Sequence, residues 1–170
     1  SEHATNVPLT INNSTGTQDI LRLQDNGTNV FVMADGGIWT TAFQSAAKSY
    51  HQTGQSLSAG ETAKATFGTE SYDIKSEYDT GAYRLTATVS GVYLVSVNLT
   101  SASVVTTHIY KNGSSVSERR SDLGSGEHAI TDIVQLSAGD YVEVFCVDGG
   151  ASSSLGLSDG SGFFAISKIG

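Results

Sequence analysis

Apolar and polar residues alternate in short runs along most of the chain, and turn residues separate the runs. This alternation is typical of half-buried β-strands, and no segment keeps a helical period. Residues 41–50 fit either kind of element by pattern, and 49–60 form a connection rich in Ser, Gly and Gln. Strands are predicted further along the chain at 63–67, 81–88, 92–100, 104–111, 115–123, 128–136, 141–147, 153–157 and 162–169. About ten strands at this spacing predict an antiparallel sandwich or barrel.

The first 39 residues carry shorter alternating runs, at 7–11, 21–24 and 30–33. Three strands of about five residues are too short to build a core of their own. This segment must therefore bury its apolar side chains against copies of itself in other chains or against the domain that follows. The regular spacing and the polar turns favour the first alternative. We therefore predict a β-stem for trimerisation over 1–39 and a head domain over 40–170.

Two of the predicted strands, 92–100 and 141–147, are apolar on both faces. In 141–147, Val142, Val144 and Cys146 form one face, and aromatic residues share the other with Glu143. A strand in a monomeric sandwich turns one face to water, so a second apolar face implies a second buried surface, which an oligomer interface would supply. The aromatic residues predicted to line this interface are Tyr93, Tyr141, Phe145 and Phe164.

Composition and charge exclude several classes of partner. The 170 residues hold 9 basic and 17 acidic side chains, a formal charge of -8 that would repel nucleic acid and anionic lipid. No apolar run approaches the roughly 18 to 20 residues that cross a bilayer, so no membrane insertion is expected. Ser1-Glu2-His3 resembles neither a Met-initiated start nor a signal peptide, and we expect a processed piece. The one cysteine, Cys146, is predicted to be a small buried hydrophobe without a disulfide partner in this chain.

Four motifs in the head follow one another in the order of a known family. They read Glu-Tyr-Asp-Thr-Gly-Ala-Tyr at 77–83 with Ser-Gly-Val-Tyr-Leu-Val-Ser at 90–96, Ile-Tyr-Lys-Asn-Gly at 109–113, Leu-Ser-Ala-Gly-Asp-Tyr-Val at 136–142 and Ser-Gly-Phe-Phe-Ala-Ile at 161–166. They resemble the signatures of the complement-component-1q globular head, except that Asp79 meets Thr80 without the usual spacer. The resemblance implies a ten-strand jelly roll of the tumour-necrosis-factor type, assembled as a homotrimer through aromatic faces.

Residues 1–39 lack the Gly-X-Y period of the collagen stalks that the animal members carry. Residues 19–37 instead resemble stem segments of bacteriophage tail fibres, in which short β-segments alternate with Asp-Gly and Asn-Gly turns in intertwined trimers. The two resemblances together describe a trimeric head on a trimeric stem.

No catalytic constellation stands out, and we predict that the chain is not an enzyme. Residues 156–160 match the G-x-S-x-G pattern around Ser158, but a strand follows and no His lies downstream. The four histidines lack the spacing of a zinc site, and structural roles are expected for His108 and His128.

Calcium is the cofactor that the resemblance suggests. Calcium-binding members of the family place acidic ligands in the loop that here contains Asp122 and Glu127, and a solvated acidic rim is the alternative. Beside it, Arg119 and Arg120 could pair with those acids or reach an anionic sugar on a receptor. With Lys111 and Asn112 in the preceding turn, these two arginines are the candidate ligand-binding residues.

The sequence thus predicts a trimeric receptor-binding head at the C-terminal end of a phage tail fibre, attaching to a host-surface glycan or protein. The expected location is the virion or another extracellular surface. The alternatives are a capsid or spore-surface decoration without a ligand, a secreted adhesin of the same fold, and a glycan-cleaving enzyme with carboxylates in a groove between subunits.

Overall fold

The computed structural model describes residues 20–34, 39–41, 43–51, 53–121, 124–150, 152–156 and 162–170. Every regular element in these residues is a β-strand, as predicted. The chain divides into two compact units, residues 1–44 and 45–170. The division lies five residues beyond the predicted boundary, because 44 rather than 39 is the last residue of the first unit.

The first unit contains a small antiparallel sheet in the order β1 (Leu21–Asp25), β2 (Thr28–Met33) and β3 (Trp39–Thr41). Asn26 and Gly27 join β1 to β2 with φ angles of 48° and 79°, the left-handed conformation that a two-residue hairpin turn requires. Most side chains of β1 are exposed, including Leu23, so these strands form no core within the sheet. Its role as a trimerisation stem stays a prediction, and the predicted strand at 7–11 lies outside the described residues.

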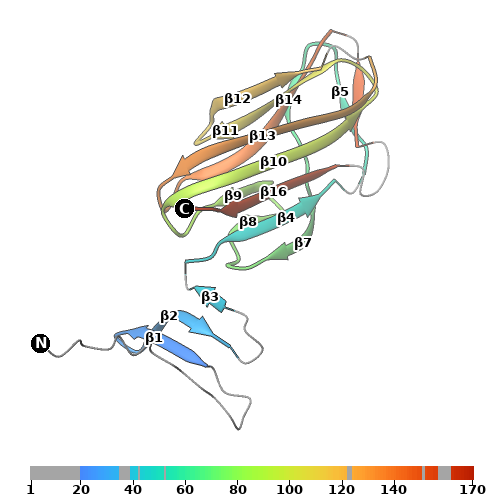
Figure 1. Ribbon diagram of the computed structural model, residues 1–170. Helices are drawn as coiled ribbons and strands as arrows, with labels where there is room; N and C mark the ends of the chain where they lie inside the picture. Colours follow the sequence, from blue (N-terminus) through green and yellow to red (C-terminus); the bar gives the residue numbers. More distant parts are fainter. Residues whose placement is uncertain are drawn as a thin grey trace, which may run out of the picture. The chain divides into compact units, whose positions relative to one another are not determined.

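The second unit is a sandwich of two antiparallel sheets (Figure 1). The seven-stranded sheet is built around β10 and has the members β4 (Ala46–Tyr50), β5 (Gln55–Leu57), β7 (Thr69–Asp73), β10 (Gly91–Ser101), β13 (Gly126–Leu136), β15 (Ser153–Leu155) and β16 (Phe163–Lys168). The six-stranded sheet is built around β14 and has the members β6 (Thr62–Lys64), β8 (Tyr78–Asp79), β9 (Arg84–Thr86), β11 (Val105–Lys111), β12 (Ser114–Arg120) and β14 (Tyr141–Asp148). This arrangement confirms the predicted jelly-roll sandwich.

The largest departures from the predicted strands fall between residues 41 and 79. Residues 46–50 are strand β4, which settles the ambiguity of 41–50, and β5 lies inside the predicted connection 49–60. Strands β7 and β8 were missed. The middle of β7 is exposed because this is the last strand on its side of the sheet, and Tyr72 is its one large hydrophobic residue, so the apolar alternation that marks a buried strand is absent.

The core lies between the two sheets and contains two of the four aromatic residues assigned to the interface. Tyr93 is fully buried and its hydroxyl donates to the Val89 carbonyl at 2.6 Å. Phe164 is also buried, with its ring centroid 5.9 Å from those of both Phe67 and Tyr78. The interface prediction is therefore wrong for Tyr93 and Phe164, because both side chains pack inside one chain.

The first resemblance motif, 77–83, has a structural role at the edge of this core. The buried carboxylate of Glu77 accepts hydrogen bonds from the Ser45 hydroxyl and from both the hydroxyl and the backbone N–H of Thr88. The Tyr78 hydroxyl donates to the Phe67 carbonyl at 2.9 Å, and burial raises the pKa of this phenol. Cys146 is fully buried, as predicted, and burial raises the pKa of its thiol to about 12.

Candidate functional site

The outer face of the seven-stranded sheet carries most of the exposed apolar side chains of the head. Six large hydrophobic residues are exposed in the described part of 45–170, and five of them lie on or directly beside this face while the sixth, Val116, lies on β12. Leu94 and Ile133 sit opposite each other across the β10 and β13 pair, 38% and 60% exposed. We call the set of five the apolar sheet face: Tyr72, Ile74, Leu94, Ile133 and Ile169.

A cation lies among aromatic rings on the same side of this sheet. Lys48, Tyr50 and Phe163 share the outer face because Phe163 is in register with Tyr50 and Ala165 with Lys48. The Lys48 ammonium lies 5.0 Å from the Tyr50 ring centroid and 4.6 Å from that of Phe163. Hydrogen bonds from Ser71 and Lys48 lower the pKa of the Tyr50 phenol. The rings hold the amino group against the sheet, so the charged Lys48 lies among aromatic carbon on this face.

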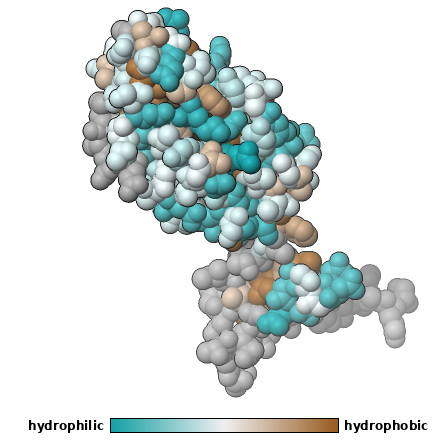
Figure 2. Space-filling view, turned by 180° about the vertical axis from the view of Figure 1, so that it is seen from behind, coloured by the Kyte–Doolittle hydropathy of each residue, from teal (hydrophilic) through white to brown (hydrophobic). Residues whose placement is uncertain are grey.

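The outer face of the six-stranded sheet has a different chemistry. Register places Tyr141, Glu143 and Phe145 of β14 on one side of the sheet, together with Lys64 of β6, Arg84 of β9 and Tyr110 of β11. We call the set of six the cation–aromatic face: Lys64, Arg84, Tyr110, Tyr141, Glu143 and Phe145. All six are half-buried except Glu143, which is buried. Seen from behind the view of Figure 1, the head is largely hydrophilic with scattered hydrophobic residues (Figure 2).

Lys64 and Glu143 neutralise each other in the middle of the cation–aromatic face. Their side chains form an ion pair, and the Lys64 ammonium also donates to the Ala82 carbonyl at 3.2 Å. The same ammonium lies 5.6 Å from the ring centroid of Phe145. Because the carboxylate is buried and paired, Glu143 adds no exposed negative charge to this surface.

Arg84 lies beside this pair with fewer polar contacts. Its guanidinium lies 4.6 Å from the ring centroid of Tyr141, and its Nε is buried without a hydrogen-bond acceptor. Asp79 stabilises the turn that precedes Arg84. Its carboxylate accepts hydrogen bonds from the N–H groups of Gly81 at 2.8 Å and Ala82 at 2.9 Å. Those bonds, with a smaller contribution from Arg84, lower the pKa of Asp79.

Aromatic contacts continue across the face toward β12. The rings of Tyr110 and Phe145 lie 4.4 Å apart, and His108 meets Tyr110 edge-on at 5.9 Å. His108 Nδ1 lies 3.1 Å from the Ser115 hydroxyl and 3.5 Å from the Glu118 carboxylate. The structural role expected for His108 is thus supported, since it ties β11 to the edge strand.

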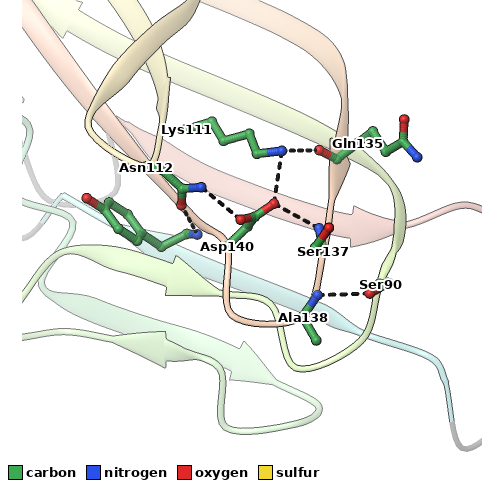
Figure 3. A network of polar contacts seen from close by, with 8 residues as sticks. Ser90, Lys111, Asn112, Gln135, Ser137, Ala138 and Asp140 are labelled. Atoms are coloured by element: carbon green, nitrogen blue, oxygen red, sulfur yellow. Dashed lines mark hydrogen bonds and ion pairs between the residues drawn. The ribbon is translucent and has the colours of Figure 1, made fainter.

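Lys111 and Asn112 hold two turns of the fold together, and Figure 3 shows the network. The Lys111 ammonium donates to the Gln135 carbonyl at 2.8 Å and pairs with the Asp140 carboxylate at 2.9 Å. The Asn112 amide donates to Asp140 and accepts from the Tyr141 N–H. These polar groups are occupied within the fold, so the arrangement does not support the ligand-binding role predicted for Lys111 and Asn112. It explains instead why the motifs at 109–113 and 136–142 occur together.

Asp140 makes this network sensitive to acid. Hydrogen bonds from Asn112, the Ser137 N–H and Lys111 lower the pKa of Asp140 to about 2. Because the pKa is lower in the folded chain than in the unfolded chain, the contribution to stability is complete above about pH 4 and is lost as the pH falls toward 2. We expect Asp140→Asn to lower the melting temperature at pH 6 and the gap from wild type to close by pH 2. A gap of constant size from pH 6 to 2 would contradict this account.

Three of the remaining predicted site residues flank the connection between β12 and β13. Arg119 and Arg120 are exposed at the end of β12, and Glu127 is exposed near the start of β13. Asp122 and Ser158 lie outside the described residues. Across the described ranges, no cluster of three or more His, Cys, Asp or Glu side chains could hold a metal ion. The calcium site therefore stays a prediction.

Two histidines, His51 and His128, are buried in the head. His128 Nε2 lies 2.5 Å from the Ser101 hydroxyl, which agrees with the structural role expected for this residue. The His51 ring packs edge-on against Phe67 at 5.6 Å. Burial lowers the pKa of both imidazoles, so both are neutral at pH 7 and contribute no charge to a binding surface.

The two-sheet topology and the register define a jelly roll of the complement-1q and tumour-necrosis-factor type. Among solved structures, murine APRIL superposes with a TM-score of 0.59 at 11% identity, covering 74% of this chain and 99% of its own. The globular domain of zebrafish complement 1qA gives 0.51 at 15% identity, over 71% and 94% of the two chains. PRD1 vertex protein P5 gives 0.54 at 11% identity, over 74% and 97%. These identities show a shared fold alone.

No family model and no curated protein sequence matches the chain. Within the described residues, no helix has the length and hydrophobicity needed to cross a membrane.

Proposed function

We propose that this chain is a homotrimeric receptor-binding head at the C-terminal end of a phage tail fibre, without enzymatic activity, which attaches to a host-surface glycan or protein. The observation that carries the trimer is the apolar sheet face, because five exposed hydrophobic residues gather on one side of the sandwich. Patches of this kind on a soluble domain mark interaction surfaces. A closed ring of three copies would remove this surface from water on every copy.

A virion location is supported by one of the structural neighbours. PRD1 vertex protein P5 is a phage vertex protein with the same fold. The same neighbour favours a second candidate function, a structural vertex or decoration protein that binds no host molecule. The two candidates share the trimer and differ in whether isolated protein attaches to cells.

The first test is the mass of the protein in solution by sedimentation equilibrium, with and without a chelator. Three chains of 17.7 kDa should give about 53 kDa. A mass of one chain in both conditions contradicts the trimer. A trimer that dissociates in chelator supports calcium near Asp122 and Glu127, whereas a chelator-resistant trimer argues against a structural calcium.

The second test is binding of fluorescently labelled protein to candidate host cells. A saturable signal that unlabelled protein competes away supports the receptor-binding head, and its absence over a broad host panel favours the decoration protein. Release of reducing sugar from host polysaccharide would contradict the non-enzymatic assignment.

A further inference from the structure

We infer that the cation–aromatic face binds an acidic oligosaccharide, with Arg84 as the group that recognises a sugar carboxylate. The inference rests on the proposed function, because it assigns the ligand class and the contact surface of the receptor-binding head. It starts from the outer face of the six-stranded sheet, which stays open to solvent if the trimer forms through the apolar sheet face on the other sheet.

Arg84 is the donor that this surface leaves unused. Within the described residues its side chain contacts the Tyr141 ring and forms no ion pair, and its buried Nε has no acceptor. The buried Nε is closed to a ligand, so a ligand would bind the terminal Nη groups, which make no hydrogen bond or ion pair within the described residues. The two carboxylates in register with Arg84 have other partners, since Glu143 pairs with Lys64 and Asp79 accepts from two backbone N–H groups, and within the described residues neither forms an ion pair with Arg84.

The geometry of the guanidinium selects the kind of acceptor. A guanidinium offers parallel N–H groups in one plane, which match the two oxygens of a carboxylate. The Tyr141 ring packs against the guanidinium of Arg84, so a carboxylate would approach the Nη edge of the group.

The rings along β14 extend the site beyond a single carboxylate. Tyr141 and Phe145 are four residues apart on the same side of one strand, a separation of roughly 13 Å at about 3.3 Å per residue. Phe145 and Tyr110 form a joined aromatic surface at the far end. The C–H face of a sugar ring packs on aromatic carbon, so two or three linked sugars would place one ring near Arg84 and another on Phe145.

The test is titration calorimetry of the full chain with trigalacturonate as the probe, compared with neutral maltotriose and with the peptide triglutamate. We expect trigalacturonate to bind and the other two to bind at least about tenfold more weakly, a difference that corresponds to one good charged hydrogen-bonded contact. Equal binding of maltotriose would overturn the carboxylate assignment, and equal binding of triglutamate would overturn the sugar in favour of an acidic peptide. Absence of trigalacturonate binding would overturn the inference as a whole.

Arg84→Gln should weaken trigalacturonate binding at least about tenfold, and Arg84→Lys should recover part of the loss because it restores charge without the planar pair of donors. Arg22→Gln is the matched control, since it makes the same charge change at an exposed position of β1 in the first unit, and it should change affinity less than about twofold. Thermal melting and sedimentation mass establish that each variant folds and assembles. Unchanged affinity in Arg84→Gln would overturn the role of Arg84.

This inference can fail separately from the proposed function. Host-cell binding that persists in Arg84→Gln, with no trigalacturonate binding by the wild-type chain, contradicts the acidic-sugar site alone. Absence of cell binding by the wild type contradicts the receptor-binding head, whatever the calorimetry shows.

Discussion

Replacing Leu94 and Ile133 by Glu in the same chain is expected to convert the proposed trimer into a folded monomer. The two residues face each other across the β10 and β13 pair on the apolar sheet face. Carboxylates there would have to be buried in the trimer without partners, at a cost of several kcal/mol per charge. The monomer fold should survive, because both side chains are already exposed to solvent in the single chain.

Sedimentation equilibrium measures this change as a fall from about 53 kDa to the 17.7 kDa of one chain. Val116→Glu is the matched control, because Val116 is 47% exposed on β12 and belongs to the other sheet. It should leave the mass at three chains. If the Leu94→Glu and Ile133→Glu double variant stays trimeric, the apolar sheet face is not the interface between the chains.

Phe164→Ala is expected to destabilise the head by about 3 to 5 kcal/mol, the usual cost of emptying a buried aromatic site. Phe164 is 1% exposed and packs against Phe67 and Tyr78 between the sheets. Phe145→Ala should cost less than half as much, because Phe145 lies half-buried on the outer face. The contrast separates a core aromatic residue from a surface one that the sequence pattern grouped with it.

The free energy of unfolding in urea measures this difference. Both substitutions are best made in the Leu94→Glu and Ile133→Glu background, since dissociation makes the stability of an oligomer depend on protein concentration. Circular dichroism before unfolding establishes that each variant begins folded. Equal losses for Phe164→Ala and Phe145→Ala would contradict the placement of Phe164 in the core.

Alternation alone predicted the long strands of this sandwich well. Strands β10, β11, β13 and β14 lie close to the predicted ranges, because each is long, apolar on at least one face and bounded by turn residues. Strands β5, β7 and β8 contain two to five residues and lie at or near the edges of sheets. Short edge strands bury too little to leave a pattern in the sequence.

The sequence was a poorer guide to which face of each strand packs against the other sheet. Strand β10 has apolar residues on both sides, and its sequence does not say which side meets the other sheet. The structure places Tyr93 inside and Leu94 outside, so the apolar sheet face consists mainly of aliphatic residues. The inference that a doubly apolar strand needs a second partner still applies to Leu94.

The cation–aromatic face could not be derived from the sequence. Lys64, Arg84 and Tyr141 come from three separate strands, and only the pairing of β6 and β9 with β14 places them on one side of a sheet. No spacing between positions 64, 84 and 141 encodes that pairing. The motif at 109–113, in contrast, attracted a ligand-binding prediction because its residues are polar and lie in a turn, although Asp140 already satisfies them.

Because Cys146 is buried, chemical modification of its thiol reports unfolding of the head. A thiol with no exposure to water and a pKa near 12 resists alkylation while the sheets stay closed. Since it is the one cysteine in the sequence, the rate at which a maleimide modifies the chain measures how often the interior of the head opens, without an engineered cysteine. The head can also be made in a reducing cytoplasm, because its fold depends on no oxidative step within the chain.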